Sequence, residues 1–188
     1  MIIRTGNHIS TFFGSPRRNG YSSSLHEAAI STACGTVRRF YIYDMTIRPC
    51  TGCGYCRINS KCSIHDDMSL IIESVLSSDV ITFSFPLYFS SIPGPMKTMI
   101  DRFQVLWEAS RRGEYPVKDQ RGLAFVTAGS EYSGMFAPST TILRHLMNSL
   151  GGSFCVDESI LCPGLDTDKG LASYRKILED VKKVFEKN

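Results

Sequence analysis

The sequence predicts a single α/β domain, residues 1–188, in which a parallel β-sheet lies between two layers of helices. Three observations carry this prediction. Short apolar runs typical of buried strands alternate along the chain with segments of helical periodicity. Strands that alternate with helices imply right-handed crossovers, and therefore parallel strands covered on both faces. The chain has the length of one domain and holds no internal repeat, low-complexity tract or linker long enough to divide it.

The first half of the chain supplies two strands and two helices. A strand is expected over residues 9–13 and a helix over 22–34, whose start is marked by a capping box of Ser24 and Glu27. Residues 37–43 alternate between two faces, which indicates a strand at the edge of the sheet. Asp66 and Asp67 are expected to cap the next helix. Its apolar residues fall at i, i+3, i+4, i+7 and i+8: Met68, Ile71, Ile72, Val75 and Leu76.

The second half supplies three more strands, which brings the prediction to five strands and five helices. The apolar run 80–85 stops at Pro86 and predicts a buried strand. Pro95 opens a helix that continues to Leu106. A buried strand over 123–128, a helix over 138–150 and a strand over about 154–161 follow. The last helix carries Tyr174, Ile177, Leu178, Val181 and Phe185 on its apolar face.

The loop between the first strand and the first helix has the composition of a phosphate-binding loop. It contains Gly14, Gly20 and Arg17, which allow close backbone approach and a charge-assisted hydrogen bond. The helix that follows offers free N–H groups at its start. The residue pattern matches neither Gly-x4-Gly-Lys-Ser/Thr nor Gly-x-Gly-x-x-Gly. A mononucleotide is therefore favoured over a nucleoside triphosphate or a dinucleotide. The alternative is an ordinary surface turn. The candidate hydroxyl donors are those of Ser15, Ser22, Ser23 and Ser24.

Two further loops are expected beside this one. In a parallel sheet, ligands bind beyond the carboxyl ends of the strands. Residues 85–95 offer aromatic rings, hydroxyls and rigid Gly and Pro residues, where a flat ring fits. Residues 127–132 are small at first and then polar. A phosphate loop beside an aromatic slot suggests FMN, and the alternative for each later loop is a routine strand-to-helix connection.

Four of the seven cysteines lie in a loop insertion at about residues 48–65, which we call the cysteine loop. Their spacings of two, two and five residues resemble the ferredoxin-type pattern for a [4Fe–4S] cluster. Structural zinc more often uses two distant Cys-x2-Cys pairs. A third alternative is that the thiols hold no metal. The candidate ligands are Cys50, Cys53, Cys56 and Cys62, whereas Cys34, Cys155 and Cys162 are expected to be structural.

Together these motifs resemble the NAD(P)H-dependent FMN reductase and iron-sulfur flavoprotein family. The resemblance rests on residues 14–25, the cysteine loop, Pro86 with Tyr88, and Lys97-x3-Asp101-Arg102. It implies a flavodoxin-like three-layer sandwich of strand order 2-1-3-4-5, with FMN bound in a homodimer or dimer of dimers. Tyr21 departs from the asparagine of many relatives. The candidate FMN-binding residues are Ser15, Arg17, Asn19, Gly20, Ser22, Ser23, Pro86, Leu87, Tyr88, Phe89, Ser90, Thr127, Ala128 and Gly129.

The resemblance implies an FMN-dependent oxidoreductase that passes electrons from NAD(P)H, as co-substrate, to small acceptors such as quinones or flavins. The alternative is an iron-sulfur flavoprotein that relays electrons from ferredoxin through a [4Fe–4S] cluster and FMN. No catalytic side chain is expected, because the flavin carries the chemistry. A second alternative is a non-enzymatic flavin-binding carrier or sensor, although a pI of about 8.5 is unlike an acidic carrier.

Composition excludes several other classes of function. The formal net charge is only +3, and the basic residues are scattered without an aromatic-basic stripe, so no nucleic-acid partner is expected. No apolar run approaches the roughly 18 residues of a membrane span, and no export signal is recognisable at the N-terminus. We therefore expect a cytoplasmic protein with no membrane partner, in which the odd number of cysteines serves metal or redox chemistry rather than disulfides.

Overall fold

The predicted α/β architecture is confirmed by a computed structural model, which describes residues 7–31, 33, 35–114 and 118–186. The strands are β1 Asn7–Phe13, β2 Gly35–Tyr41, β3 Val80–Pro86, β4 Arg121–Thr127, β5 Ser153–Phe154 and β6 Ile160–Cys162. The helices are α1 Tyr21–Ile30, α2 Met68–Ser77, α3 Gly94–Arg102, α4 Gln104–Arg111, α5 Ala137–Ser149 and α6 Asp168–Glu186. The parallel order β2-β1-β3-β4-β5, with β6 paired to β4, is the predicted flavodoxin-like order.

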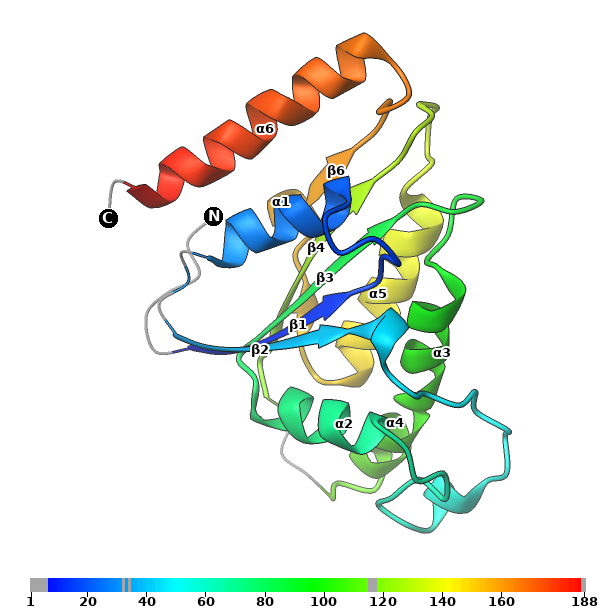
Figure 1. Ribbon diagram of the computed structural model, residues 1–188. Coiled ribbons are helices and arrows are strands. Elements are labelled where there is room, and N and C mark those ends of the chain that lie inside the picture. Colours follow the sequence, from blue (N-terminus) through cyan, green and yellow to red (C-terminus); the bar gives the residue numbers. More distant parts are fainter. Residues whose placement is uncertain (1–6, 32, 34, 115–117, 187–188) are drawn as a thin grey trace.

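The sheet separates two layers of helices (Figure 1). Helices α1 and α6 lie on one face, and α2 to α5 lie on the other. The central strands β1, β3 and β4 are buried on both faces, as their continuous apolar runs predict. Register places Phe12 opposite Phe83, whose ring centroids are 5.6 Å apart, and Phe83 opposite Ala124. These residues belong to the large core cluster beneath α2 to α5, and Leu25 and Phe125 belong to the smaller one beneath α1 and α6.

Of the two predicted helix caps, the first is wrong and the second holds for Asp66 but not for Asp67. The N-cap of α1 is Gly20, no side chain caps it, and the capping box of Ser24 and Glu27 is therefore wrong. The Glu27 carboxylate instead accepts hydrogen bonds from Arg39 and from the Tyr41 hydroxyl on β2. Glu27 therefore pairs with residues of the neighbouring strand β2 and not with the start of its own helix. At α2, the N-cap Asp67 makes no capping bond, and Asp66 accepts the N–H of Met68 at 3.2 Å.

Two predicted elements are split in the structure. The helix that opens near Pro95 divides at Phe103 into α3 and α4, because tight turns join Phe103 to Ile100 and Leu106. The last strand divides into β5 and β6 around a short 3-10 helix, Val156–Glu158. At this break the Ser159 hydroxyl accepts the Ala124 N–H at 2.9 Å, which replaces a strand-to-strand bond.

Three smaller points of the prediction also have outcomes. Leu76 was expected on the buried face of α2 but is 45% exposed. Cys34 and the side chain of Phe185 lie outside the part of the chain that the structure describes. Within that part, no helix combines the length and the apolar character needed to cross a membrane.

Candidate functional site

A pocket of about 490 Å³ opens at the carboxyl ends of β1, β3 and β4. The loop after β1 and the start of α1 form one wall, and the ends of β3 and β4 form the other. Three loops far apart in sequence therefore meet at one edge of the sheet, as expected for a parallel α/β fold. The lining residues are Ser15, Arg17, Asn19, Gly20, Tyr21, Ser22, Pro86 and Thr127.

The loop after β1 is wound tightly around one carbonyl group. The Arg17 carbonyl accepts hydrogen bonds from the Gly20 N–H at 3.0 Å and from the hydroxyls of Ser15 and Ser23, both at 3.2 Å. A Cβ at Gly20 would lie 3.1 Å from this carbonyl oxygen, so a larger residue would crowd the close turn. Ser22 is buried and lines the pocket. The loop thus directs the uncapped start of α1 toward the pocket, which is the arrangement that binds anions.

The two adjacent arginines of this loop have different surroundings. Arg18 stacks on the ring of Tyr41, 3.9 Å from its centroid, and forms an ion pair with Asp44. Arg17 is exposed and lines the pocket. Arg17 is therefore the loop cation placed to meet an anionic ligand.

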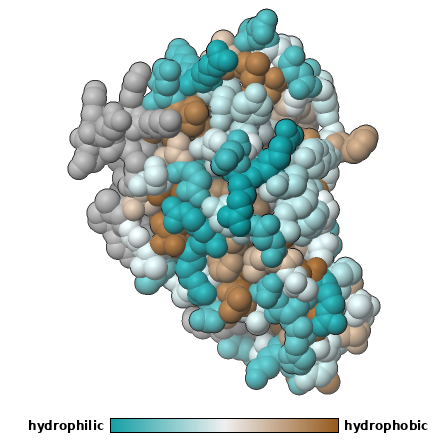
Figure 2. All heavy atoms as spheres, in the orientation of Figure 1, coloured by the Kyte–Doolittle hydropathy of each residue, from teal (hydrophilic) through white to brown (hydrophobic). Residues whose placement is uncertain are grey.

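The loop between β3 and α3 borders the pocket only at its base. Pro86 lines the pocket, and the Leu87 N–H donates to the Thr127 carbonyl at 2.8 Å, which ties the ends of β3 and β4 together. Phe89 and Ser90 have positive φ angles of 48° and 60°, and the Phe89 side chain is fully exposed. Figure 2 shows an apolar projection at the place of this loop, on a face where hydrophilic and small apolar areas are otherwise mixed. Six predicted residues flank the pocket rather than line it, namely Leu87, Tyr88, Phe89, Ser90, Ala128 and Gly129.

Ser23 also lies behind the pocket wall, since its hydroxyl is used on the Arg17 carbonyl. Two residues near the pocket were absent from the predicted set. Tyr21 lines it and is held from behind by Tyr174 of α6, whose hydroxyl donates to the Tyr21 carbonyl at 3.0 Å. The Asp166 carboxylate lies so close to Gly129 that a Cβ there would overlap it. The position of Tyr21 inside the loop was a usable signal, whereas nothing near Asp166 in the sequence marks it.

The cysteine loop lies after β2 and beside α4 (Figure 1). All four of its cysteines line one pocket of about 430 Å³, together with residues of α3 and α4. Cys50 and Cys53 are exposed, and Cys56 and Cys62 are half-buried. Positive φ angles of 64° at Gly52 and 74° at Gly54 turn the chain tightly between the first cysteines. The structure therefore gathers the four predicted metal ligands around a single opening.

The thiols differ in their surroundings. The Ser63 hydroxyl, 3.4 Å from the Cys53 sulfur, holds the pKa of that thiol below its usual value. Burial raises the pKa of Cys56, and the charges of Glu108, Cys62 and Cys50 raise it further. The charges of Cys50 and Cys62 thus both act on the Cys56 thiol.

The spacing of the sulfurs bears on the kind of metal. A single zinc ion needs four donors about 2.3 Å from one point. In the described ranges, no three Cys, His, Asp or Glu side chains are close enough to hold one metal ion. An iron-sulfur cluster instead binds each thiolate at a separate iron, so its ligands stand further apart. The four thiols therefore surround one pocket, but in the described ranges they are not gathered around a single point.

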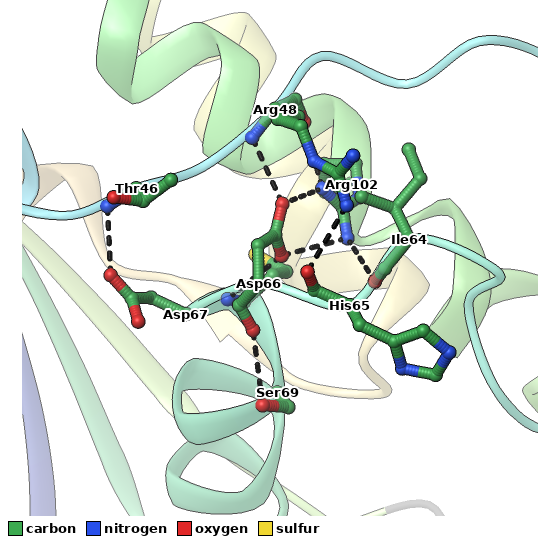
Figure 3. Close-up of polar contacts among 9 residues, drawn as sticks. Thr46, Arg48, Ile64, His65, Asp66, Asp67, Ser69 and Arg102 are labelled. Atoms are coloured by element: carbon green, nitrogen blue, oxygen red, sulfur yellow. Dashed lines mark hydrogen bonds and ion pairs between the residues drawn. The ribbon is translucent and has the colours of Figure 1, made fainter.

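Two buried side chains join the ends of the cysteine loop to the fold (Figure 3). Asp66 and Arg102 are 2% and 1% exposed in their side chains and form a bidentate ion pair at 2.7 and 3.1 Å. Burial opposes the charge of Asp66, but hydrogen bonds from Arg102, Arg48 and Met68 outweigh it and lower the pKa of the carboxyl. Arg102 takes no part in the i, i+4 ion pair of its own helix, which joins Lys97 to Asp101.

A second arginine holds the far end of the loop. Arg112 donates to the carbonyls of Cys56 and Arg57, both at 2.8 Å. It is oriented by an ion pair with Glu114, which also accepts a hydrogen bond from Ser60. The shape of the loop therefore depends on polar contacts to α3, α4 and the following turn. Outside the loop, Cys155 is half-buried and Cys162 buried, and both are free thiols.

The sequence model of the NADPH-dependent FMN reductase family matches residues 8–159. Among curated proteins, an iron-sulfur flavoprotein of Methanosarcina thermophila is 31% identical over 131 residues, which are 67% of this chain and 65% of that protein. One iron-sulfur flavoprotein of Archaeoglobus fulgidus is 35% identical over 92 residues, 47% of this chain and 42% of that protein. The chain thus spans between about two fifths and two thirds of the length of these relatives.

Solved structures share the fold at low sequence identity. An NAD(P)H:quinone oxidoreductase from Methanothermobacter marburgensis superposes with a TM-score of 0.74 at 16% identity, covering 95% of this chain and 94% of its own. An azoreductase from Bacillus anthracis str. Sterne gives 0.68 at 19% identity, covering 98% of this chain and 100% of its own. At such identities the likeness establishes the shared architecture.

Proposed function

This chain belongs to the NADPH-dependent FMN reductase family, and from that premise we propose that it binds FMN and passes electrons from NAD(P)H to small acceptors such as quinones or free flavins. Membership of a reductase family makes the chain an oxidoreductase. The pocket at the carboxyl ends of β1, β3 and β4 is the observation that supports FMN as its cofactor. It joins an anion-binding helix start to the ends of two neighbouring strands.

The pocket residues suit the two ends of a flavin mononucleotide. Ser15, Ser22 and Arg17, with the N–H groups that begin α1, would hold the phosphate. Pro86 and Thr127 would border the ring, with the loops 87–90 and 128–129 flanking it. FMN, when bound, supplies hydride and electron transfer, so the side chains bind and orient rather than act as acid or base. No catalytic side chain is therefore proposed.

Titration of the cofactor-free protein with FMN tests this function directly. We expect quenching of flavin fluorescence with one FMN per chain, followed by oxidation of NADH or NADPH when a quinone is added. Turnover separates an enzyme from the non-enzymatic carrier that the sequence left open. A protein that takes up no FMN would overturn the proposal.

Replacing Arg17 by alanine is expected to weaken FMN binding roughly tenfold to a hundredfold, because a charge-assisted hydrogen bond contributes about 1.5–3 kcal/mol. Arg18→Ala is the matched control, since Arg18 is held by Tyr41 and Asp44. Fluorescence titration of both variants gives the dissociation constants. Equal losses in the two variants would mean that the loop binds phosphate by general charge and not through Arg17.

A second version of the function is favoured by the four cysteines that line one pocket. In this version Cys50, Cys53, Cys56 and Cys62 would hold a [4Fe–4S] cluster, which would supply single-electron transfer between ferredoxin and FMN. The printed name of the curated relatives, iron-sulfur flavoprotein, supports it. The match covers only 65% and 42% of those two relatives. The electron donor and the electron acceptor of this chain are therefore both part of the proposal.

Protein purified without oxygen is expected to carry about four iron atoms per chain, and Cys62→Ser to lose most of them while retaining FMN. Cys155→Ser is the matched control, because Cys155 is a free, half-buried thiol outside the cysteine loop. Iron analysis and the visible spectrum provide the measurement. Equal iron in all three proteins would contradict the assignment of the ligands.

We further propose that one domain holds both sites and that the chain forms a homodimer or a dimer of dimers. The exposed Phe89 and Tyr88 at the tip of the β3–α3 loop support association, because it would cover apolar rings that a monomer leaves in water. Sedimentation of the full chain measures the assembly.

A further inference from the structure

Three pockets meet on the exposed face of α4, beside the cysteine loop. The first is the pocket of the four cysteines, the second has a volume of about 610 Å³ and lies along α4, and the third, of about 420 Å³, lies between α3, α4 and α5. Gln104 lines all three pockets, and Trp107 lines the second and the third. The pockets therefore adjoin one another and form a groove that opens onto the four thiols, which we call the α4 groove.

The centre of the α4 groove is aromatic. Trp107, the single tryptophan of the chain, is 37% exposed, and Tyr55, which lines the pocket of the four cysteines, is 45% exposed. The Arg111 guanidinium lies over the Trp107 ring, 4.8 Å from its centroid. Tryptophan, tyrosine and arginine are the residues that most often anchor contacts between proteins. The groove therefore has the composition of a docking site for a protein.

The two segments that border the groove carry a surplus of positive charge. Residues 48–65 hold three basic and no acidic side chains, and residues 104–114 hold two basic and two acidic ones. The formal net charge of these two segments is therefore +3, which equals the net charge of the whole chain. The remaining residues are neutral on balance, so the surplus charge of the molecule resides at the groove.

Two of these positive charges are open to a partner. Lys61 and Arg111 are exposed, and no ion pair involves either of them in the part of the chain that the structure describes. The two glutamates of residues 104–114 pair instead with Arg57 and Arg112. Carboxylates of a partner would therefore meet Lys61 and Arg111 without breaking an existing ion pair.

A second copy of the chain is a poor occupant of this groove. A twofold contact would place the same positive surface against itself, and like charges across an interface cost free energy. The exposed rings of Tyr88 and Phe89, which support association, lie on the β3–α3 loop, at the other end of α3 from the α4 groove (Figure 1). A nucleic acid is also disfavoured, because its phosphates would meet Glu108, which lines two of the three pockets.

We propose that the α4 groove is the docking site of a small one-electron carrier protein with an acidic face, of the ferredoxin class, seated beside the four cysteines. This inference rests on the iron-sulfur version of the proposed function and assigns the place at which electrons enter. In each encounter the reduced carrier loses one electron and leaves oxidised, the protein gains that electron, and no atom or proton is transferred. Electrostatic attraction speeds such encounters, and the interfaces of electron carriers are small.

Binding is measured with the full chain, purified without oxygen, and an oxidised two-[4Fe–4S] ferredoxin of acidic net charge, so that no electron transfer is required. Calorimetry is carried out at about 0.01 M and about 0.15 M salt, where the Debye length is about 30 Å and about 8 Å. The affinity is expected to be at least tenfold higher at the lower salt concentration. Carbodiimide, which joins amines to carboxylates, is expected to link Lys61 to the ferredoxin but not Lys176, which is exposed on α6.

Two variants test the groove itself. Arg111→Glu is expected to weaken binding at least tenfold at the lower salt concentration, and Trp107→Ala to weaken it at least tenfold at both, because salt does not screen an apolar contact. Arg175→Glu is the matched control, since it makes the same charge change at an exposed residue of α6, on the opposite face of the sheet (Figure 1). Circular dichroism checks that each variant is folded. If Trp107→Ala fails to fold, Arg111→Glu and the cross-link still decide the question.

The outcomes separate this proposal from the function on which it rests. Absence of iron from the unaltered protein would overturn the iron-sulfur version of the function. Iron present without binding of the ferredoxin, or equal losses in Arg111→Glu and Arg175→Glu, would overturn the docking site and leave that function standing. A dimer in sedimentation that Trp107→Ala dissociates would also overturn it, because a second copy would then occupy the groove. Tighter binding of a single-stranded oligonucleotide than of the ferredoxin would assign the groove to nucleic acid instead.

Discussion

Replacing Asp66 by alanine is expected to destabilise the protein by about 3–5 kcal/mol, because removal of one partner of a buried ion pair leaves an uncompensated charge. Both side chains of the pair are almost fully buried. Asp66 also accepts the N–H groups of Arg48 and Met68, which lose their partner in the variant. Urea unfolding, followed by circular dichroism without added FMN, measures the loss.

Helix α3, which carries Arg102, also provides the matched control. Lys97 and Asp101 form an exposed i, i+4 pair on α3, with side chains 41% and 50% exposed. Asp101→Ala should change stability by no more than about 0.5 kcal/mol, since water screens such pairs. A loss below about 1 kcal/mol for Asp66→Ala would show that water or a relaxed loop compensates the buried guanidinium.

The Asp66 pair also joins the cysteine loop to α3, so the variant should affect the loop before the whole fold. We expect the loop to become accessible to protease at urea concentrations that leave the rest of the protein folded. The cleavage site can be located by mass spectrometry. Asp101→Ala should show no such early cleavage.

Lowering the pH from about 7 to about 5 is expected to cost about 2 kcal/mol of stability through His26. Burial, with a contribution from the charge of Arg39, lowers the pKa of His26 from 6.5 to about 3. Below pH 6.5 His26 binds a proton in the unfolded state but stays neutral in the folded state. Stability is therefore complete above pH 6.5 and is lost progressively as the pH falls toward 3.

The environment of His26 explains why the ring stays neutral. It lies between the rings of Phe13 and Phe125, with centroids 4.5 and 4.8 Å away, and its Nε2 is 2.7 Å from the Thr82 hydroxyl. Its Nδ1 is buried and has no hydrogen-bond partner in the described chain. A second proton on the ring would thus be buried without an acceptor.

The free energy of unfolding, measured at about pH 7 and at about pH 5, reports this effect. Both pH values lie above the range in which most carboxyl groups of the unfolded chain titrate. His26→Gln should be less stable at pH 7 but should lose most of the dependence on pH. His145→Gln is the control, because His145 is exposed on α5. If all three proteins showed the same dependence on pH, another group would be responsible.

The prediction from sequence was most successful where neighbouring residues decide the structure. Apolar runs of five or six residues located β1, β3 and β4, since burial on both faces of a parallel sheet requires such runs. The same runs implied that Ser15, Pro86 and Thr127 would meet at one edge of the sheet, and all three line one pocket. Spacing also brought the four cysteines to a common opening.

The prediction failed where a distant residue competes with a near one. Glu27 was assigned to a capping box but bonds Arg39 and Tyr41 on the neighbouring strand. The aromatic loop after β3 is a separate case: Pro86 lines the pocket and Phe89 is exposed, and the contact of this loop with a flat ring stays a prediction. Local propensity is worth a few tenths of a kcal/mol to about 1 kcal/mol, which a tertiary contact readily outweighs.

The sequence by itself determined the class of fold, the order of the elements and the edge of the sheet where the loops with chemistry gather. These follow from periodicity and from the geometry of parallel strands, which are local properties. Only the tertiary structure decided that Arg102 turns from its own helix to Asp66, 36 positions away, and that His26 is enclosed against Thr82. Such pairs arise because a buried charge or ring must find its partner in space, and spacing along the chain carries no record of that choice.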